Sequence, residues 1–150
     1  MPEQPTDRFY EYSDRELSVR LPAYLRPKKG MRFFKVRSDK DEGRPLQCMS
    51  IEFMNDAGTE AVWSTIMNAK PLEWMGARDH IVRRGKADYL PDGLEVLMTN
   101  TASVRPDVHT YNILFLASGR RVYATFVGRG DLDQFDALCR AVVSSIRATD

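Results

Sequence analysis

The chain has 150 residues, of which 43% are hydrophobic and 29% are charged, a balance typical of one ordinary globular domain. Its 22 basic and 21 acidic residues leave a net charge of +1. A general nucleic-acid binder needs a basic surface field, and a mimic of nucleic acid needs an acidic one. We therefore expect no nucleic-acid partner.

The sequence carries no signal for export or for a membrane. The polar start predicts a flexible leader over residues 1–8, followed by a single domain over residues 9–150. A secretory signal needs a basic region and then an apolar run, and a membrane span needs roughly 20 apolar residues. The widely separated Cys48 and Cys139 predict two buried free thiols. Together these features indicate a soluble protein of a reducing cytoplasm.

Two short strands are expected at the start of the domain, over Phe9–Tyr12 and Leu17–Leu21. The second alternates apolar and polar residues, as a half-buried strand does. The turn-like segment Ser13–Glu16 joins the two strands, and Pro22 ends the second. A basic loop is expected over Pro27–Gly30.

The next segment predicts two more strands, Met31–Arg37 and Leu46–Met54, separated by the charged solvent loop Ser38–Pro45. A helix follows over Thr59–Lys70. Thr59 is a natural N-cap, and Pro71 ends the helix. The helix carries one apolar stripe made of Val62, Trp63, Ile66, Met67 and Ala69.

The second half of the chain predicts an antiparallel meander, because four apolar runs alternate with turn sequences. The strands are His80–Ala87, Leu94–Val104, Val108–Ser118 and Arg121–Gly128, and the turns are Pro91–Gly93, Arg105–Asp107 and Ser118–Arg120. The segment Tyr111–Leu116 is largely apolar on both faces. It should be a central strand with a cover on each face, and a partner protein is a candidate for one of them.

The final helix is the clearest element in the sequence. Asp131 is its N-cap, and its apolar residues recur at spacings of three and four: Leu132, Phe135, Leu138, Cys139, Val142, Val143 and Ile146. Together the elements predict an α+β fold, with a mainly antiparallel sheet of about six to eight strands sandwiched with two principal helices.

The sequence shows no pattern typical of a catalytic, metal or cofactor site. A nucleophile–base pair would need His80 or His109, and neither stands in a diagnostic context. Cysteine and histidine do not cluster as in a metal site, and Gly128–Gly130 lacks the lysine and serine or threonine of a phosphate loop. We therefore expect no catalytic residues, no metal and no cofactor.

Six internal methionines lie in or beside the predicted apolar elements: Met31, Met49, Met54, Met67, Met75 and Met98. Methionine is common on surfaces that accept varied apolar partners, and it also fills gaps in ordinary cores. Both interpretations are open at this point.

The order of elements resembles the PsbP/DcrB-type α/β/α sandwich. The likeness rests on Phe9–Leu21 with Pro22 after it, the Thr59–Lys70 helix, the meander through Thr125-Phe126, and the ending Phe135–Ile146. The resemblance implies a protein-binding role without catalysis. Members of that family without a signal peptide include the bacterial Eag-type chaperones of type VI secretion, which hold apolar segments of effectors.

Our leading hypothesis is a non-enzymatic protein-binding domain, a bacterial secretion chaperone or adaptor, whose partner is a secreted effector. It would bind through one apolar sheet face with Phe34, Val36, Met49, Ile51 and Phe53. One alternative is an immunity protein that blocks a toxin with loops such as Ser38–Pro45 or Asp79–Arg84. Another is a small-ligand carrier or enzyme with a cavity lined by His80 or His109. A homodimer is compatible with each of these.

Overall fold

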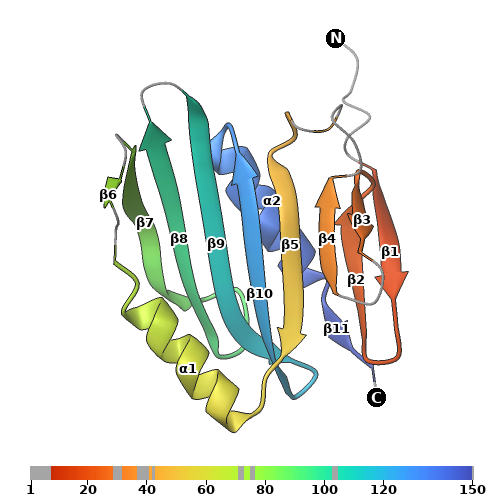
Figure 1. Cartoon of the computed structure of the whole chain (residues 1–150). Coiled ribbons are helices and arrows are strands. Elements are labelled where there is room, and N and C mark those ends of the chain that lie inside the picture. Colours follow the sequence, from red (N-terminus) through yellow and green to blue (C-terminus); the bar gives the residue numbers. More distant parts are fainter. Residues whose placement is uncertain are drawn as a thin grey trace.

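The computed structural model describes residues 8–28, 32–36, 41, 43–70, 73–74, 77–102 and 105–149. The predicted leader lies outside these residues except for Arg8. The described residues form two antiparallel sheets and two helices, so the predicted α+β class is confirmed (Figure 1).

The larger sheet has eight strands, as the sequence led us to expect, in the order β3-β4-β5-β10-β9-β8-β7-β6. Every pair is antiparallel. The predicted meander is its second half, β7 to β10, and β9 lies inside the sheet. The strands are β3 Leu25–Pro27, β4 Phe33–Val36, β5 Leu46–Phe53, β6 Glu73–Trp74, β7 Ala77–Ala87, β8 Gly93–Ala102, β9 Arg105–Ala117 and β10 Arg120–Arg129.

A second sheet of three strands was not expected. It contains β1 (Phe9–Ser13), β2 (Leu17–Pro22) and the short C-terminal strand β11 (Arg147–Ala148), with β2 in the middle. β11 pairs with the start of β2. The end of the chain is thereby joined to its beginning.

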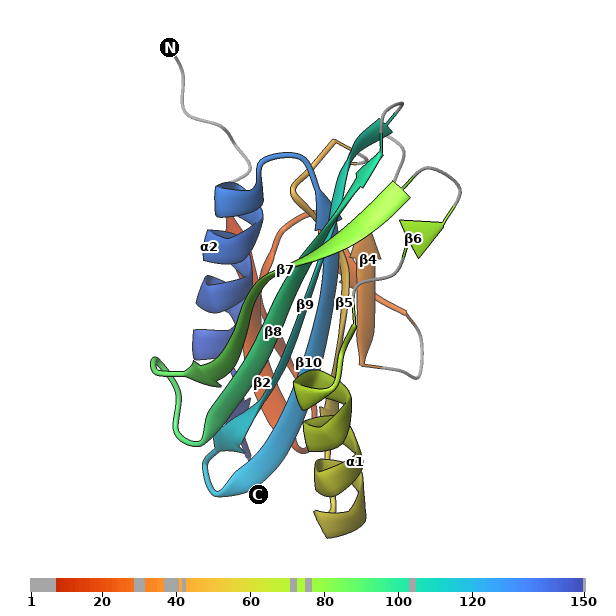
Figure 2. The same ribbon diagram turned by 90° about the vertical axis from the view of Figure 1, so that its left-hand side faces the viewer.

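The two sheets and two helices form three layers. One face of the large sheet carries α2 (Leu132–Ser144) together with the small sheet, and the other carries α1 (Asp56–Met67), as Figure 2 shows. No helix within the described residues is long and apolar enough to cross a membrane.

The main core lies under α2 and the small sheet. Phe34, Met49, Phe126 and Tyr111 form one row across four strands, and all are at most 1% exposed. The cover comes from β2 and α2, through Leu17, Val19, Leu21, Phe135, Cys139, Val142 and Val143. Leu17, Val19 and Leu21 confirm the alternation expected of β2.

The other face is only partly apolar. Ile66 of α1 packs on Val96 and Leu114 in a second, smaller cluster. Beyond the helix the face turns polar, because Asn112 Oδ1 accepts hydrogen bonds from the hydroxyls of Tyr123 (2.7 Å) and Thr125 (3.2 Å). These polar groups satisfy one another and can face water. A partner protein as the cover of this face of the central strand stays a prediction.

Three local predictions need correction. α1 begins at Asp56 rather than after Thr59, because the side chain of Asn55 accepts a hydrogen bond from the Gly58 N–H (2.7 Å) and caps the helix. Arg105–Asp107 belongs to β9 and is not a turn. The basic loop predicted at Pro27 begins later, since Leu25–Pro27 is β3.

Two other local predictions are confirmed. The side chain of Asp131 accepts from the Gln134 N–H (2.9 Å) and caps α2. Ser118 and Gly119 both have positive φ, 53° and 81°, and form the two-residue turn between β9 and β10.

Gly128 is required by close packing. It lies where the register of β10 against β5 shifts, and the next residue, Arg129, donates its N–H to the Pro45 carbonyl (2.9 Å). A Cβ at Gly128 would overlap that carbonyl oxygen and the Phe135 ring, which are a main-chain atom and a buried core group. Only glycine fits between β5 and α2 at this point.

We predict that Gly128→Ala lowers the free energy of unfolding by about 2–4 kcal/mol, since overpacking against a fixed backbone forces the core apart. Urea denaturation would measure the loss. Gly43→Ala is the matched control, because a Cβ there meets no atom within 4 Å. Equal stability of the two variants would contradict the close approach.

Candidate functional site: a charged groove between the two sheets

A groove of about 890 Å³ lies where the turn between β1 and β2 meets the end of β5, and it is open to solvent rather than enclosed. Its volume is toward the upper end of the range of about 300–1,000 Å³ known for ligand pockets. Its lining residues are Tyr12, Asp14, Arg15, Glu16, Pro27, Lys28, Arg32, Ile51, Glu52 and Phe53.

The β1–β2 turn is shaped by Asp14. Its Oδ1 accepts hydrogen bonds from the backbone N–H groups of Glu16 (2.8 Å) and Leu17 (3.1 Å), the local bonding that makes aspartate a turn residue. Thr149 holds the turn from the C-terminal side. It donates its N–H to the Glu16 carbonyl (2.7 Å) and its hydroxyl to the Arg15 carbonyl (2.9 Å). The turn is thus held by its own Asp14 side chain and by Thr149.

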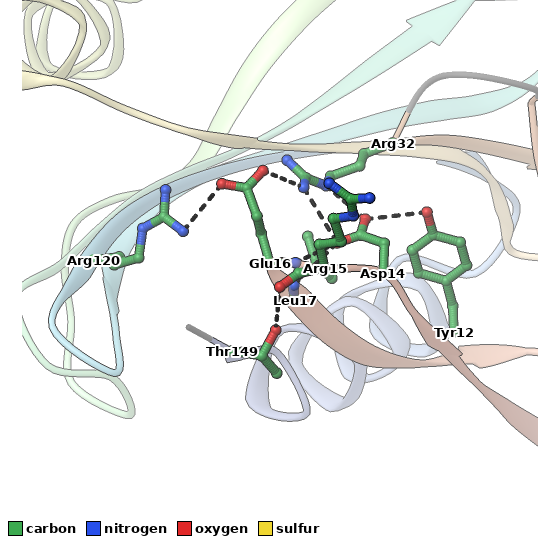
Figure 3. A network of polar contacts seen from close by, with 8 residues as sticks. All are labelled: Tyr12, Asp14, Arg15, Glu16, Leu17, Arg32, Arg120 and Thr149. Carbon is green, nitrogen blue, oxygen red and sulfur yellow. Dashed lines mark hydrogen bonds and ion pairs between the residues drawn. The ribbon is translucent and has the colours of Figure 1, made fainter.

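Arg32 joins this turn to the large sheet, as Figure 3 shows. Its Nε and Nη2 donate to the two oxygens of Asp14 (2.8 and 3.2 Å), and Nη2 also donates to Oε1 of Glu16 (2.7 Å). The side chains of Arg32 and Asp14 are only 24% and 25% exposed. A two-point guanidinium–carboxylate contact of this kind fixes orientation as well as distance. Tyr12 adds a hydroxyl donor to Asp14 (3.2 Å).

Arg120, the first residue of β10, closes the network on its far side. Its Nη1 bonds to Oε2 of Glu16 (3.3 Å), and its guanidinium lies 3.6 Å from the centre of the Phe53 ring. Arg32 approaches the same ring at 5.1 Å. The Phe53 ring therefore contacts two cations, which its ring quadrupole attracts. The start of β4, the start of β10 and the end of β5 thus meet at this ring.

These contacts change the charge state of the groups involved. The hydrogen bonds from Arg32 hold the pKa of the Asp14 carboxyl well below its usual value, and they lower the pKa of Glu16 as well. Burial, followed by the hydrogen bond to Asp14, raises the pKa of the Tyr12 hydroxyl. At neutral pH the network therefore consists of two cations and two carboxylates that neutralise one another.

The lowered pKa of Asp14 predicts a pH dependence of stability. Because this pKa is lower in the folded protein than in the unfolded chain, the contribution of Asp14 is complete above pH ~4 and is lost as the pH falls further. The difference in free energy of unfolding between wild type and Asp14→Asn should be largest near neutral pH and shrink below pH ~4. Urea denaturation across this range would measure it.

Glu60→Gln is the control for that experiment, since Glu60 is an exposed carboxylate of α1 outside the network. It should track wild type at every pH. A constant difference between wild type and Asp14→Asn down to the lowest pH would contradict the role of the ionised carboxylate.

A second polar cluster lies beneath α2. Glu95, 2% exposed, accepts from Arg83 and from the Tyr111 hydroxyl (2.6 Å), and Arg83 also binds both oxygens of Asp136 (2.9 and 3.0 Å). Tyr89 shares a hydrogen bond with the Tyr111 hydroxyl (2.7 Å). The cluster links β7, β8 and β9 to α2, and it borders a small cavity of about 390 Å³. These contacts fix the position of the helix.

Burial dominates the electrostatics of this cluster. Desolvation raises the pKa of the Tyr89 hydroxyl to about 12 and raises the pKa of Tyr111 much further, so both stay protonated as donors. Arg83 and Arg140 hold the pKa of Asp136 below its ordinary value, although burial opposes them. Permanently charged partners of this kind are typical of a structural network.

We predict that Glu95→Ala lowers the free energy of unfolding by about 2–3 kcal/mol, because it removes the carboxylate acceptor of the buried Tyr111 hydroxyl and leaves Arg83 with Asp136 alone. Tyr89→Phe removes only one neutral hydrogen bond and should cost about 1 kcal/mol. Glu11→Ala, at an exposed strand position in β1, is the matched control and should cost little. Thermal or urea denaturation would rank the three variants. Equal losses for Glu95→Ala and Glu11→Ala would refute the network.

The histidines and cysteines lie in different surroundings. His109 is 1% exposed, its Nε2 lies 2.7 Å from the Gly130 carbonyl, and its Nδ1 lies 2.8 Å from the Thr99 hydroxyl. Since a carbonyl only accepts, Nε2 donates to Gly130, while Nδ1 and the Thr99 hydroxyl share a hydrogen bond. His80 is exposed. Both cysteines are free thiols, with Cys139 buried and Cys48 half-buried. No three His, Cys, Asp or Glu side chains among the described residues could hold a metal ion.

The structure distributes the five predicted partner-binding residues between the core and the groove. All five belong to the face covered by α2 and the small sheet. Phe34 and Met49 are at most 1% exposed and offer no surface to a partner. The candidate binding surface therefore excludes these two residues. Val36 is half-buried against the core. Ile51 and Phe53 line the groove, and their contact with a partner stays a prediction.

Sequence reasoning missed the charged residues of the groove. The turn at Ser13–Glu16 was expected, and Asp14 is a common turn residue, but the sequence does not show that Arg32 and Arg120 reach it. The available signal was the pair of acids around Arg15 in a tight turn. Their partners depend on how the small sheet packs.

The fold defines the chain as an α+β sandwich with a groove between its sheets. No family model matches the sequence, and no curated protein is significantly similar to it. Among solved structures, the Saccharomyces cerevisiae Ran-binding protein Mog1p has a similar fold. The two agree with a TM-score of 0.51 over 95% of this chain and 96% of that one, at 10% sequence identity. At this identity the likeness concerns the fold alone.

Proposed function

We propose that the protein is a protein-binding module that acts without catalysis and takes a segment of its partner into the groove. The observation that carries this proposal is the groove itself. It is large, open to solvent, and lined by the half-buried rings of Tyr12 and Phe53 together with charged side chains. An enclosed cavity suits a small substrate, whereas an open groove with an apolar lining and a polar rim suits a chain segment.

Two further observations support this proposal. Mog1p, whose fold is similar, is described as a Ran-binding protein, which gives a precedent for protein binding by a sandwich of this kind. The buried His109 has both ring nitrogens engaged, with no carboxylate at either. The alternative of an enzyme or carrier built on His109 therefore has less support.

The specific form that we propose is a chaperone or adaptor that holds a segment of a secreted protein in the bacterial cytoplasm. The apolar part of the lining supports it, because the half-buried rings of Tyr12 and Phe53 offer contact to apolar side chains of such a segment, whereas Ile51 is buried beneath them. An immunity protein would instead use loops such as residues 38–45, parts of which lie outside the described residues. The other predicted loop, Asp79–Arg84, is corrected, because it belongs to strand β7.

Site-specific photo-crosslinking tests the proposed function. A photoreactive amino acid at Arg15, on the groove rim, should form an adduct with one partner protein in the native cell, and excess unlabelled protein should compete it away. The same probe at the exposed Ala61 of α1, in the opposite layer, is the control and should form no such adduct. Equal adducts at both positions, or none at Arg15, would overturn the proposal.

A further inference from the structure

The charges around the groove divide into two groups. Arg32 and Arg120 are engaged by Asp14 and Glu16 in the network described above. Arg15 and Lys28 also line the groove, are exposed, and make no ion pair with another described residue. The first group holds the structure together, and the second is available to a ligand.

The position of these two cations follows from the fold. Arg15 lies at the tip of the β1–β2 turn, held by the backbone contacts of Asp14 on one side and Thr149 on the other. Lys28 follows β3 and donates its N–H to the Phe33 carbonyl (2.8 Å), which fixes the backbone there. Both cations are thus carried by anchored backbone on the groove rim, which reduces the entropy lost when they bind.

Glu52, the remaining acid of the lining, makes no ion pair with Arg15 or Lys28. Glu52 lies between Ile51 and Phe53 on β5, and strand alternation turns its side chain to the opposite face, where its cross-strand partner Tyr123 packs in the α1 cluster. The lining holds three cations, Arg15, Lys28 and Arg32, and three acids, Asp14, Glu16 and Glu52, and Arg120 lies beside it. Arg15 and Lys28 are the two cations of the lining that no carboxylate of the described residues engages.

We propose that the groove binds an acidic, extended segment of a partner protein, with alternate apolar side chains on the apolar lining and carboxylates at Arg15 and Lys28. An extended strand presents its side chains to two sides in alternation. Apolar side chains on one side can therefore contact the apolar lining while acidic side chains on the other contact the charged rim. This inference rests on the proposed protein-binding function and adds the chemistry of the partner.

The same charges do not favour a nucleic acid. Only two cations are uncompensated, which is fewer than the several phosphate contacts on which nucleic-acid affinity depends. An acidic peptide carries its charges farther apart and supplies apolar groups for the apolar lining.

Fluorescence anisotropy with defined probes tests the inference. The probes are a labelled peptide of alternating Glu and Leu, the same peptide with Lys or with Ser in place of Glu, and a labelled single-stranded oligonucleotide. We expect the Glu peptide to bind about tenfold more tightly than the others, and its affinity to fall as salt rises. The double variant Arg15→Glu/Lys28→Glu should lose about tenfold in affinity for the Glu peptide.

Arg20→Glu/Arg129→Glu is the matched control. It makes the same change in net charge at two exposed positions outside the groove lining, and it should bind the Glu peptide as wild type does. Unchanged circular dichroism of both double variants would show that each is folded.

Three outcomes overturn the inference. They are preference for the Lys or Ser peptide, tighter binding of the oligonucleotide, and loss of Glu-peptide binding in the control as large as in the groove variant. Failure of every probe also overturns it. The photo-crosslinking result at Arg15 stands apart from these outcomes, because it detects a partner segment of any composition. An adduct there without preference for acid would refute this inference and leave the proposed function in place.

Discussion

The structure depends on how one wide apolar sheet face is covered. The row from Phe34 to Tyr111 runs across four strands, and a single helix is too narrow to cover it, since a helix with its side chains is about 10–12 Å in diameter while strands lie about 4.8 Å apart. α2 covers one part, and β2 covers another with Leu17, Val19 and Leu21. The small sheet exists because this second part must also be buried.

The groove is a consequence of that divided cover. Where the small sheet ends, its turn stands against the end of β5, and the two edges do not close on each other. Arg32 and Asp14 join them by hydrogen bonds, while Arg120 approaches from the start of β10. The groove is thus held by the ion pairs of Arg32 and Arg120 with Asp14 and Glu16. It also presents Arg15 and Lys28, which make no ion pair with another described residue. The same arrangement supplies both rigidity and a binding chemistry.

The periodic elements could be predicted from the sequence because their signal is local. β7 to β10 and α2 follow from alternation, turn residues and the cap at Asp131. The errors arose where two local signals competed. Both Asn55 and Thr59 are good caps, and the hydrogen bond from Gly58 to the Asn55 side chain decides the helix start. The turn-like Arg105–Asp107 lies within a strand because β8 pairs with Arg105 before it and Val108 after it. Three short strands, β3, β6 and β11, have too few residues for any period to show.

The sequence by itself determined the class of the fold, the meander and which residues of each strand share a face, because these follow from the period of side chains along a strand or helix. It also placed Phe34, Val36, Met49, Ile51 and Phe53 together on one face, and they do share it. Only the tertiary structure decided that this face is the covered one, since that depends on β2 crossing it. Only the tertiary structure brought Asp14, Arg32 and Arg120 together, because pairing between distant residues leaves no local period in the sequence.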